Sequence, residues 1–254
     1  MEVRVLFFGI LKDVVGRDVE TLHLEQGSTL ADVLAHYERM PGMRNLLSSL
    51  AVSINYEYAG PEATLNAQDE IALLPPVSGG AADLAQDTSA RRQEHEAPGQ
   101  CAIVRLPIET NSILTRMKAA EDGAAVVFEG IVRNHTRGRR TLYLEYEAYE
   151  PMALKQMQEL STHALQQLKI RDLAIVHRLG RLEIGETSVL IVVTSAHRGP
   201  AFEACRWVID TLKRTVPIWK KEYFEDGAVW ADGESFPPEI VPAQGTAAIK
   251  PASK

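Results

Sequence analysis

A segment of paired prolines and paired glycines, LPPVSGG at residues 74–80, constrains the fold of this chain most strongly. Pro75 and Pro76 cannot donate ladder hydrogen bonds, so a strand that reaches them must end there. The two glycines lack a Cβ and leave a thin, flexible backbone that fits a narrow channel. The residues that follow are rich in Ala, Gln and charge and predict a flexible linker. We therefore expect two domains, at 1–80 and 101–234, with a linker at 81–100 and a loose tail at 235–254.

The composition is that of a globular protein with room for two modest cores, because the 254 residues are 45% hydrophobic and 24% charged. No apolar run is long enough to span a membrane and the first residues lack a secretion-signal pattern, so we expect a cytoplasmic protein without membrane contact. The net charge of -7 argues against non-specific nucleic-acid binding. Cys101 and Cys205 show no zinc-ligand spacing with each other or with histidines, so we expect no disulfide, metal or cofactor.

Residues 1–80 have the pattern of a small β-rich domain around one helix. A helix is predicted to begin at Thr29, because Thr29 and Asp32 have capping-box spacing and the apolar residues that follow recur at helical intervals. A loop through Gly16 is predicted between the first two strands. The predicted strands are 2–8, 20–25, 51–58 and 71–74, which gives the order β, β, α, β, β.

This segment resembles the ubiquitin-like β-grasp sulfur carriers, and in particular the small subunits of molybdopterin synthases. The resemblance rests on VRVLFFGILKDVVG at residues 3–16 and on DEIALLPPVSGG at residues 69–80. It implies that Gly79 and Gly80 form a tail whose terminal carboxylate is adenylated by an E1-like enzyme and converted to a thiocarboxylate by a sulfur donor system. The alternative is a β-grasp interaction module whose Gly-Gly pair has no chemical role.

The Gly80 carbonyl is in a peptide bond to Ala81, and an amide offers no carboxylate for adenylation. We therefore hypothesise that a protease cuts after Gly80, at an exposed junction of small residues. The alternative class of function is a non-catalytic or autoinhibited fusion, in which the uncut β-grasp domain plugs the pocket of the second domain.

Residues 101–234 predict an α+β domain. We expect the strand at 141–148 to pair with that at 125–132 across the basic loop at 133–140. The predicted helices are 111–120, 151–168 and 200–216, and the predicted strands are 102–106, 125–132, 141–148, 173–179, 187–195, 218–223 and 229–231.

The second domain resembles the large, catalytic subunits of molybdopterin synthases. The segments that carry the resemblance are FEGIVRNH (128–135), LEYEAYEPMA (144–153), VHRLGRLEIGE (176–186), TSAHRGPAFEA (194–204) and LKRTVPIWKKE (212–222). The resemblance implies an α/β hammerhead fold that works as a dimer. It also implies transfer of two sulfurs from carrier thiocarboxylates to cyclic pyranopterin monophosphate, which forms the dithiolene of molybdopterin.

Three cationic residues are of the types that hold a phosphate by charge-assisted hydrogen bonds: Arg133, His197 and Arg198. His197 and Arg198 also precede a predicted helix N-terminus, which attracts anions. Their alternative role is that of surface cations beside a helix cap.

Lys213 and Lys220 match the catalytic lysines of the family that the second domain resembles. Pro217 should turn the chain so that Lys220 returns beside Lys213, and a neutral lysine there could act as a base or as an amine nucleophile. We assign Lys213 to proton transfer or transient covalent chemistry, Lys220 to charge stabilisation, and Lys221 and Glu222 to secondary substrate contacts. The alternative is lysines that merely complement a helix C-terminus.

Arg198 and Lys213 lie at opposite ends of one predicted helix, roughly 20 Å apart, so one small substrate could hardly touch both. A two-fold dimer that brings His197 and Arg198 of one subunit to the lysines of the other resolves this, and cleavage would then give an assembly of two carriers and two catalytic chains. The acidic segment after Trp230 departs from the family pattern, in which a further basic residue often follows, so residues 231–234 lack the cation that would contact a phosphate there.

Overall fold

The computed structural model describes residues 1–77, 99–231, 233 and 236. The chain divides into two compact units, which meet in the sequence at Pro76 and Val77, and each is described by itself. The predicted Gly79–Gly80 tail and nearly all of the predicted linker and C-terminal tail lie outside the described residues. None of the helices in the described part of the chain is long and apolar enough to cross a membrane.

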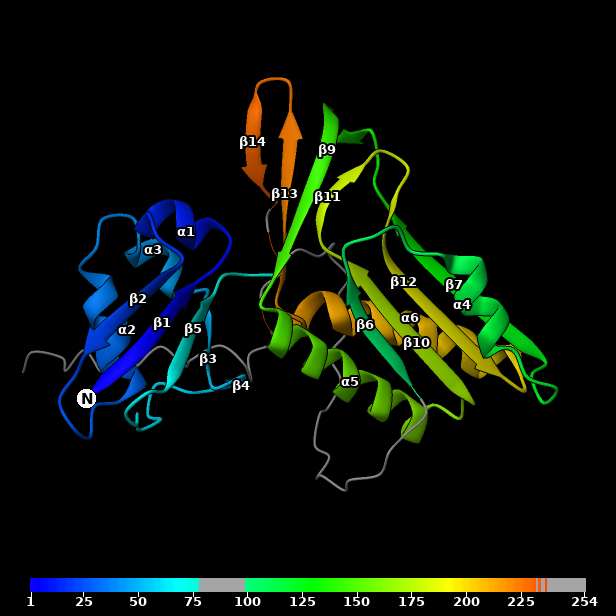
Figure 1. Cartoon of the computed structure of the whole chain (residues 1–254), viewed down its shortest axis with the longest axis horizontal. Helices are drawn as coiled ribbons and strands as arrows, with labels where there is room; N and C mark the ends of the chain where they lie inside the picture. The colour runs from blue at the N-terminus through cyan, green and yellow to red at the C-terminus, as the bar shows by residue number, and fades with distance from the viewer. Residues whose placement is uncertain (78–98, 232, 234–235, 237–254) are drawn as a thin grey trace, which may run out of the picture. The chain divides into compact units, whose positions relative to one another are not determined.

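The described residues of the first unit form a five-stranded mixed sheet with one main helix, the β-grasp arrangement (Figure 1). The strand order is β2-β1-β5-β3-β4, with β1 and β5 parallel and the other pairs antiparallel. Its elements are β1 (Glu2–Phe7), α1 (Ile10–Val15), β2 (Val19–His23), α2 (Leu30–Glu38), α3 (Arg44–Leu47), β3 (Ala51–Ile54), β4 (Glu57–Tyr58) and β5 (Glu70–Leu74).

The α2 helix packs its apolar side against the sheet. Its Val33 and Tyr37 are fully buried in the same cluster as Phe7 of β1. The Tyr37 hydroxyl donates to Glu20 of β2 at 3.0 Å, so the one polar atom of this core ring is satisfied. At the start of α2 the Thr29 backbone N–H donates to the Asp32 carboxylate at 2.8 Å, which confirms the predicted capping box.

Two predictions for the first unit are wrong. The segment before Gly16 is not a loop but the short helix α1, which Gly16 ends in the left-handed conformation at φ 73°. The predicted strand 51–58 is a hairpin, because Asn55 and Tyr56 both have positive φ and reverse the chain as a two-residue turn requires. Asn55 tolerates this conformation, and its side-chain amide donates to Asp69 at 2.8 Å.

The described residues of the second unit form two sheets and three helices (Figure 1). One sheet has the order β6-β10-β12-β7 and the other β11-β9-β13-β14, with β8 paired to β9. Its elements are β6 (Gln100–Val104), α4 (Thr110–Met117), β7 (Ala124–Ile131), β8 (His135–Thr136), β9 (Arg139–Ala148), α5 (Glu150–Gln167), β10 (Asp172–Arg178), β11 (Gly180–Glu183), β12 (Thr187–Ser195), α6 (Arg198–Thr215), β13 (Ile218–Phe224) and β14 (Gly227–Trp230).

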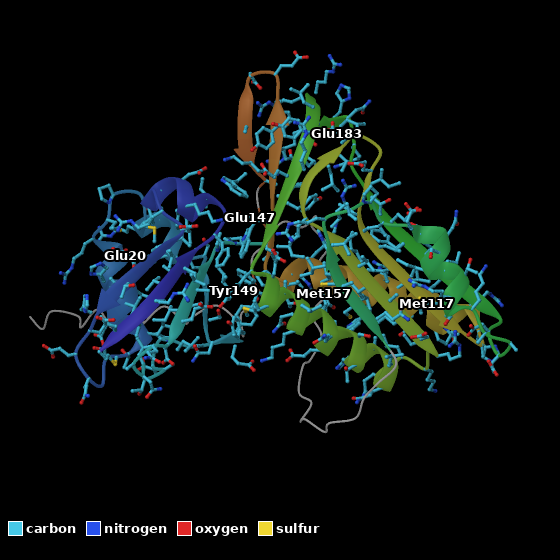
Figure 2. The ribbon with its side chains drawn as sticks, viewed as in Figure 1. Glu20, Met117, Glu147, Tyr149, Met157 and Glu183 are labelled. Atoms are coloured by element: carbon cyan, nitrogen blue, oxygen red, sulfur yellow. The ribbon has the colours of Figure 1, made fainter. Side chains whose placement is uncertain are left out.

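Helices cover both faces of the sheet β6-β10-β12-β7, which explains why its central strands are continuously apolar in sequence. On β10, Leu173 and Ile175 face the core formed with α5 and α6, in which Met157 of α5 is fully buried (Figure 2). The alternate residues Ala174 and Val176 face a smaller core on the α4 side. By this alternation the next residue on the α5 and α6 face is number 177, a histidine.

One pairing in the second unit is predicted wrongly. The strand β9 pairs with β11 and β13, whereas β7 pairs with β12. The basic segment between β7 and β9 makes its own small hairpin, in which Arg137 and Gly138 have φ 50° and 77° and β8 pairs with the start of β9. The two long strands therefore belong to different sheets. The helix α6 also begins two residues earlier than predicted, at Arg198, and β11 was not predicted.

The capping interaction of α2 predicts the cost of removing it. We expect Asp32→Ala to lower the free energy of unfolding of the first unit by about 1 kcal/mol, because the Thr29 N–H loses its acceptor. All three tryptophans lie in the second unit, so hydrogen–deuterium exchange of the α2 amides is the suitable measurement. The control is Glu25→Ala, at an exposed carboxylate, which should change the exchange little. Equal exchange in the two variants would contradict the assignment.

Candidate functional site

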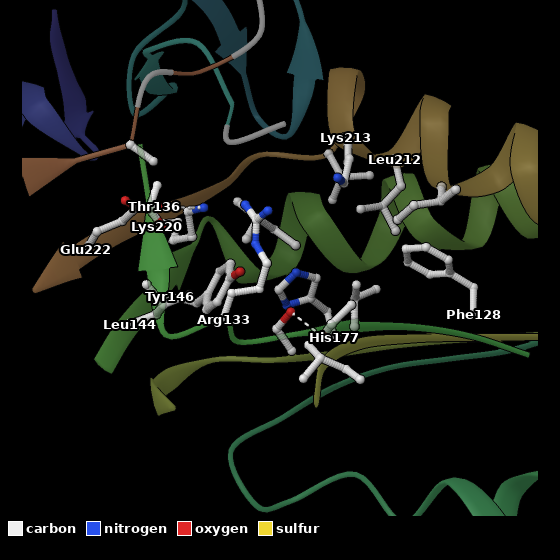
Figure 3. Close-up of a pocket in the computed structure, with 18 residues that line it drawn as sticks. Phe128, Arg133, Thr136, Leu144, Tyr146, His177, Leu212, Lys213, Lys220 and Glu222 are labelled. Carbon is white, nitrogen blue, oxygen red and sulfur yellow. Dashed lines mark hydrogen bonds and ion pairs between the residues drawn. The ribbon is translucent and has the colours of Figure 1, made fainter. Parts of the chain in front are cut away.

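A cavity of about 400 Å³ lies in the second unit, where the two sheets meet the C-terminal end of α6 (Figure 3). Strands β7, β10 and β12 of one sheet form one side, and β9 and β13 of the other sheet form another. The last turns of α6 contribute Ile209, Leu212 and Lys213. The volume is within the range of a site for one small molecule.

The turn from α6 into β13 brings two lysines to this cavity. Lys213 lies in the last turn of α6, which ends before Pro217, and β13 begins at Ile218. Residues 218, 220 and 222 alternate toward the cavity, so Lys220 and Lys213 both line it (Figure 3). Arg133, from the segment after β7, lines it as well.

The charges in the cavity are unequally neutralised. Lys220 Nζ lies 2.8 Å from Oε1 of Glu222, whose side chain is buried, so this pair is neutral as a unit. Within the described residues, neither Lys213 nor Arg133 has a hydrogen-bond or ion-pair partner. The cavity therefore carries uncompensated positive charge, which suits an anionic ligand.

His177 also lines the cavity, and sequence reasoning missed it. Its side chain is only 4% exposed and its ring lies edge-on to that of Tyr146, with centroids 5.2 Å apart. Burial lowers the pKa of the imidazole to about 4, so the ring is neutral at physiological pH. Its position at the end of an apolar strand makes it look like an ordinary core histidine, and only the cavity distinguishes it.

Three of the predicted site residues lie elsewhere. His197 and Arg198 are exposed at the start of α6, where they line a separate hollow with Gly123 and Pro200. Lys221 points away from the cavity, because it alternates with Lys220 along β13, and its ammonium lies 5.0 Å from the ring centre of Trp230. Arg198 and Lys213 are roughly 20 Å apart along α6. Gly79 and Gly80 lie outside the described residues.

The described residues contain no group of three or more His, Cys, Asp or Glu side chains that could hold a metal ion. Burial raises the pKa of the Cys101 and Cys205 thiols to about 11, so neither is a reactive thiolate.

The fold and the site define a class of protein: a β-grasp domain joined to an α+β domain with a cationic cavity. Comparison with known families matches the ThiS family at residues 5–80 and the MoaE protein family at residues 103–215. The molybdopterin synthase catalytic subunit of Pyrococcus abyssi is 39% identical over 54% of this chain and 94% of its own length. That of Bacillus subtilis is 44% identical over 50% and 82%. The solved molybdopterin synthase of Staphylococcus aureus is 43% identical over 50% and 93%, with a TM-score of 0.48.

The chain belongs to the family of molybdopterin synthase catalytic subunits and carries a ThiS-family, MoaD-like domain at its N-terminal end. This confirms the resemblances of both halves. The predicted fold class, a β-grasp domain followed by an α/β hammerhead domain, is confirmed with it.

The buried imidazole predicts a pH dependence of stability. The unfolded chain binds a proton at His177 near pH 6.5, whereas the folded chain does so only near pH 4. The unfolding free energy of the second unit should therefore fall by up to about 3 kcal/mol as the pH drops through this window. Denaturant titrations of the wild type and of His177→Phe, followed by tryptophan fluorescence, measure the difference. The variant His135→Gln, at an exposed site, should keep the wild-type dependence of the unfolding free energy on pH. The same dependence in His177→Phe would refute the assignment.

Proposed function

We propose that the chain is a molybdopterin synthase of the cytoplasm that carries its own sulfur donor. The second unit transfers two sulfurs from glycine thiocarboxylates to cyclic pyranopterin monophosphate, and the product is the dithiolene of molybdopterin. No bound cofactor takes part. The single observation that carries the proposal is the cavity at the end of α6, in which Arg133 and Lys213 present uncompensated positive charge next to the Lys220–Glu222 pair.

The cavity residues suit the chemistry of this substrate. Arg133 offers a planar guanidinium for bidentate contact with the phosphate. Lys213, half-buried and without a partner among the described residues, carries the proton transfer or the transient covalent bond. Lys220, held by Glu222, stabilises negative charge as it develops. Glu222 is a secondary contact, whereas Lys221 lies on the other face of β13, beside Trp230.

Each sulfur transfer is balanced without an oxidant or a reductant. The thiocarboxylate sulfur forms a bond to a substrate carbon, an oxygen leaves that carbon with a proton, and water then cleaves the acyl–sulfur bond. The carrier returns as a glycine carboxylate, and the sulfur stays on the substrate. Two such transfers are needed for one dithiolene.

The donor role requires a free carboxylate at Gly80. We propose that a protease cuts the chain after Gly80, and that an E1-like adenylating enzyme and a sulfur donor system then load the new terminus. The match of the ThiS family model up to residue 80 supports this end point.

We further propose that the second unit works as a two-fold dimer, and after cleavage as an assembly of two carriers and two catalytic chains. His197 and Arg198 are exposed at the far end of α6 from Lys213, so they would complete the substrate site of the partner subunit.

Activity tests the assignment of the lysines. In cells that contain the activating enzyme and the sulfur source, Lys213→Ala should lower the rate of molybdopterin formation at least about 100-fold, because proton transfer or covalent catalysis is lost. Molybdopterin made from added cyclic pyranopterin monophosphate is measured by mass spectrometry. The matched control is Lys118→Ala, at an exposed lysine near the end of α4, and it should keep the wild-type rate. Wild-type activity in Lys213→Ala would refute the assignment.

A mixed dimer tests the shared site. Chains with Arg198→Ala and chains with Lys213→Ala should each be inactive alone. Co-assembled, they should regain one intact site per dimer, about half of the wild-type rate in a pure heterodimer. Complete inactivity of that heterodimer would contradict the shared site.

A further inference from the structure

His177 lies in the wall of the cavity, on the face of β10 that looks toward α6 (Figure 3). Its side chain is almost wholly buried, so the imidazole is a fixed part of the cavity wall and not a mobile surface group. The ring packs edge-on against Tyr146 of β9, at an angle of 67° between the two planes. The strand and this aromatic contact hold the imidazole in one orientation.

The hydrogen bonding of the ring assigns its tautomer. Nδ1 lies 3.0 Å from the backbone carbonyl oxygen of Arg178, and a carbonyl can only accept, so Nδ1 carries the proton. The neutral ring then has a lone pair on Nε2, which can only accept a hydrogen bond. Among the described residues no group donates to Nε2. The imidazole therefore offers an unsatisfied acceptor at the cavity.

The other polar groups of the cavity are mainly donors. Arg133 and Lys213 can only donate, and the carboxylate of Glu222 is engaged by Lys220. Ser188 uses its hydroxyl hydrogen on the Gly130 carbonyl oxygen, at 2.9 Å. The Nε2 atom of His177, which can only accept a hydrogen bond, therefore differs from most polar groups that line the cavity. A ligand with an N–H group would donate to it.

We propose that His177 is a specificity residue, whose Nε2 accepts a hydrogen bond from an N–H group of the pterin ring system of the substrate. This inference rests on the proposed function and deepens it. A pterin carries N–H donors on its heterocycle, while the phosphate is its anionic part. Different residues of the cavity recognise the two parts of the substrate. Arg133 and the lysines bind the phosphate, and His177 binds the heterocycle. A phosphorylated molecule without such an N–H leaves Nε2 unpaired and binds more weakly.

Binding measurements on the full-length chain test this assignment. The probe is cyclic pyranopterin monophosphate, and its dissociation constant is measured by isothermal titration calorimetry. His177→Phe keeps the shape of the ring but removes the acceptor, and it should weaken binding about tenfold or more. His177→Gln can place an amide oxygen near the position of Nε2 and should restore the dissociation constant to within about threefold. The matched control is His163→Phe, whose ring stacks on Trp207 outside the cavity lining, and it should bind as the wild type does.

Two further probes test recognition of the heterocycle and recognition of the phosphate separately. A pterin without the phosphate should lose affinity in His177→Phe but not in Arg133→Ala, whereas inorganic phosphate should respond in the opposite way. A merely structural role of His177 would weaken both probes together, and the glutamine variant would then rescue neither.

The outcomes also separate this inference from the function on which it rests. Binding by the wild type with an unchanged dissociation constant in His177→Phe would overturn the role of His177 alone. Equal weakening in His177→Phe and His177→Gln would overturn it too, because the acceptor would not matter. If the wild type itself does not bind the substrate, the proposed function fails together with this inference.

Discussion

The turn at Pro217 is the constraint on which the cavity depends. Proline cannot continue the hydrogen-bonding pattern of α6, and its carbonyl oxygen instead accepts the Tyr149 N–H, 3.2 Å away, at the start of α5. The next residue, Ile218, is already paired with Ala148 of β9. One turn therefore fixes the end of a helix, the register of a strand and the start of another helix. The two lysines on either side of it are held at one cavity as a consequence.

Much of the second unit could be predicted because its elements have strong local signals. The strand Thr187–Ser195 was predicted with its observed bounds, since an apolar run between polar turns is a local pattern. The partner of β9 was predicted wrongly, because pairing is decided by tertiary packing and not by the nearest hairpin signal. The hairpin at Asn55 was missed for a related reason: the alternation of apolar residues continues through the turn and hides the reversal.

The candidate site, too, was predicted only where local sequence patterns or the family resemblance indicated it. Lys213, Lys220 and Arg133 were found through the family resemblance and the position of Pro217, and the structure brings them to one cavity. The period of a strand already separates Lys220 from Lys221, so the different surroundings of Lys221 could have been predicted from alternation alone. His177 could not be found in this way, since its environment is formed by Tyr146, α6 and β12, which are distant in sequence.

The fusion sets a stoichiometric condition on the proposed chemistry. Each chain supplies one carrier, but each dithiolene needs two sulfurs. Every catalytic site must therefore receive two carriers in succession, or the same carrier after reloading. An unsevered carrier cannot be loaded at all, because Gly80 would remain in an amide bond to Ala81. In the proposed sequence of events cleavage therefore precedes loading and loading precedes transfer, so the proposal makes activity depend on maturation of the junction.

The most direct test of this account is intact-mass spectrometry of the protein purified from its native cells. The account predicts a fragment that ends at Gly80, a part of which is heavier by the exchange of one oxygen for sulfur at its terminus. If all of the protein is uncut chain, then the fusion does not donate sulfur through Gly80, and the claim that it carries its own donor is contradicted.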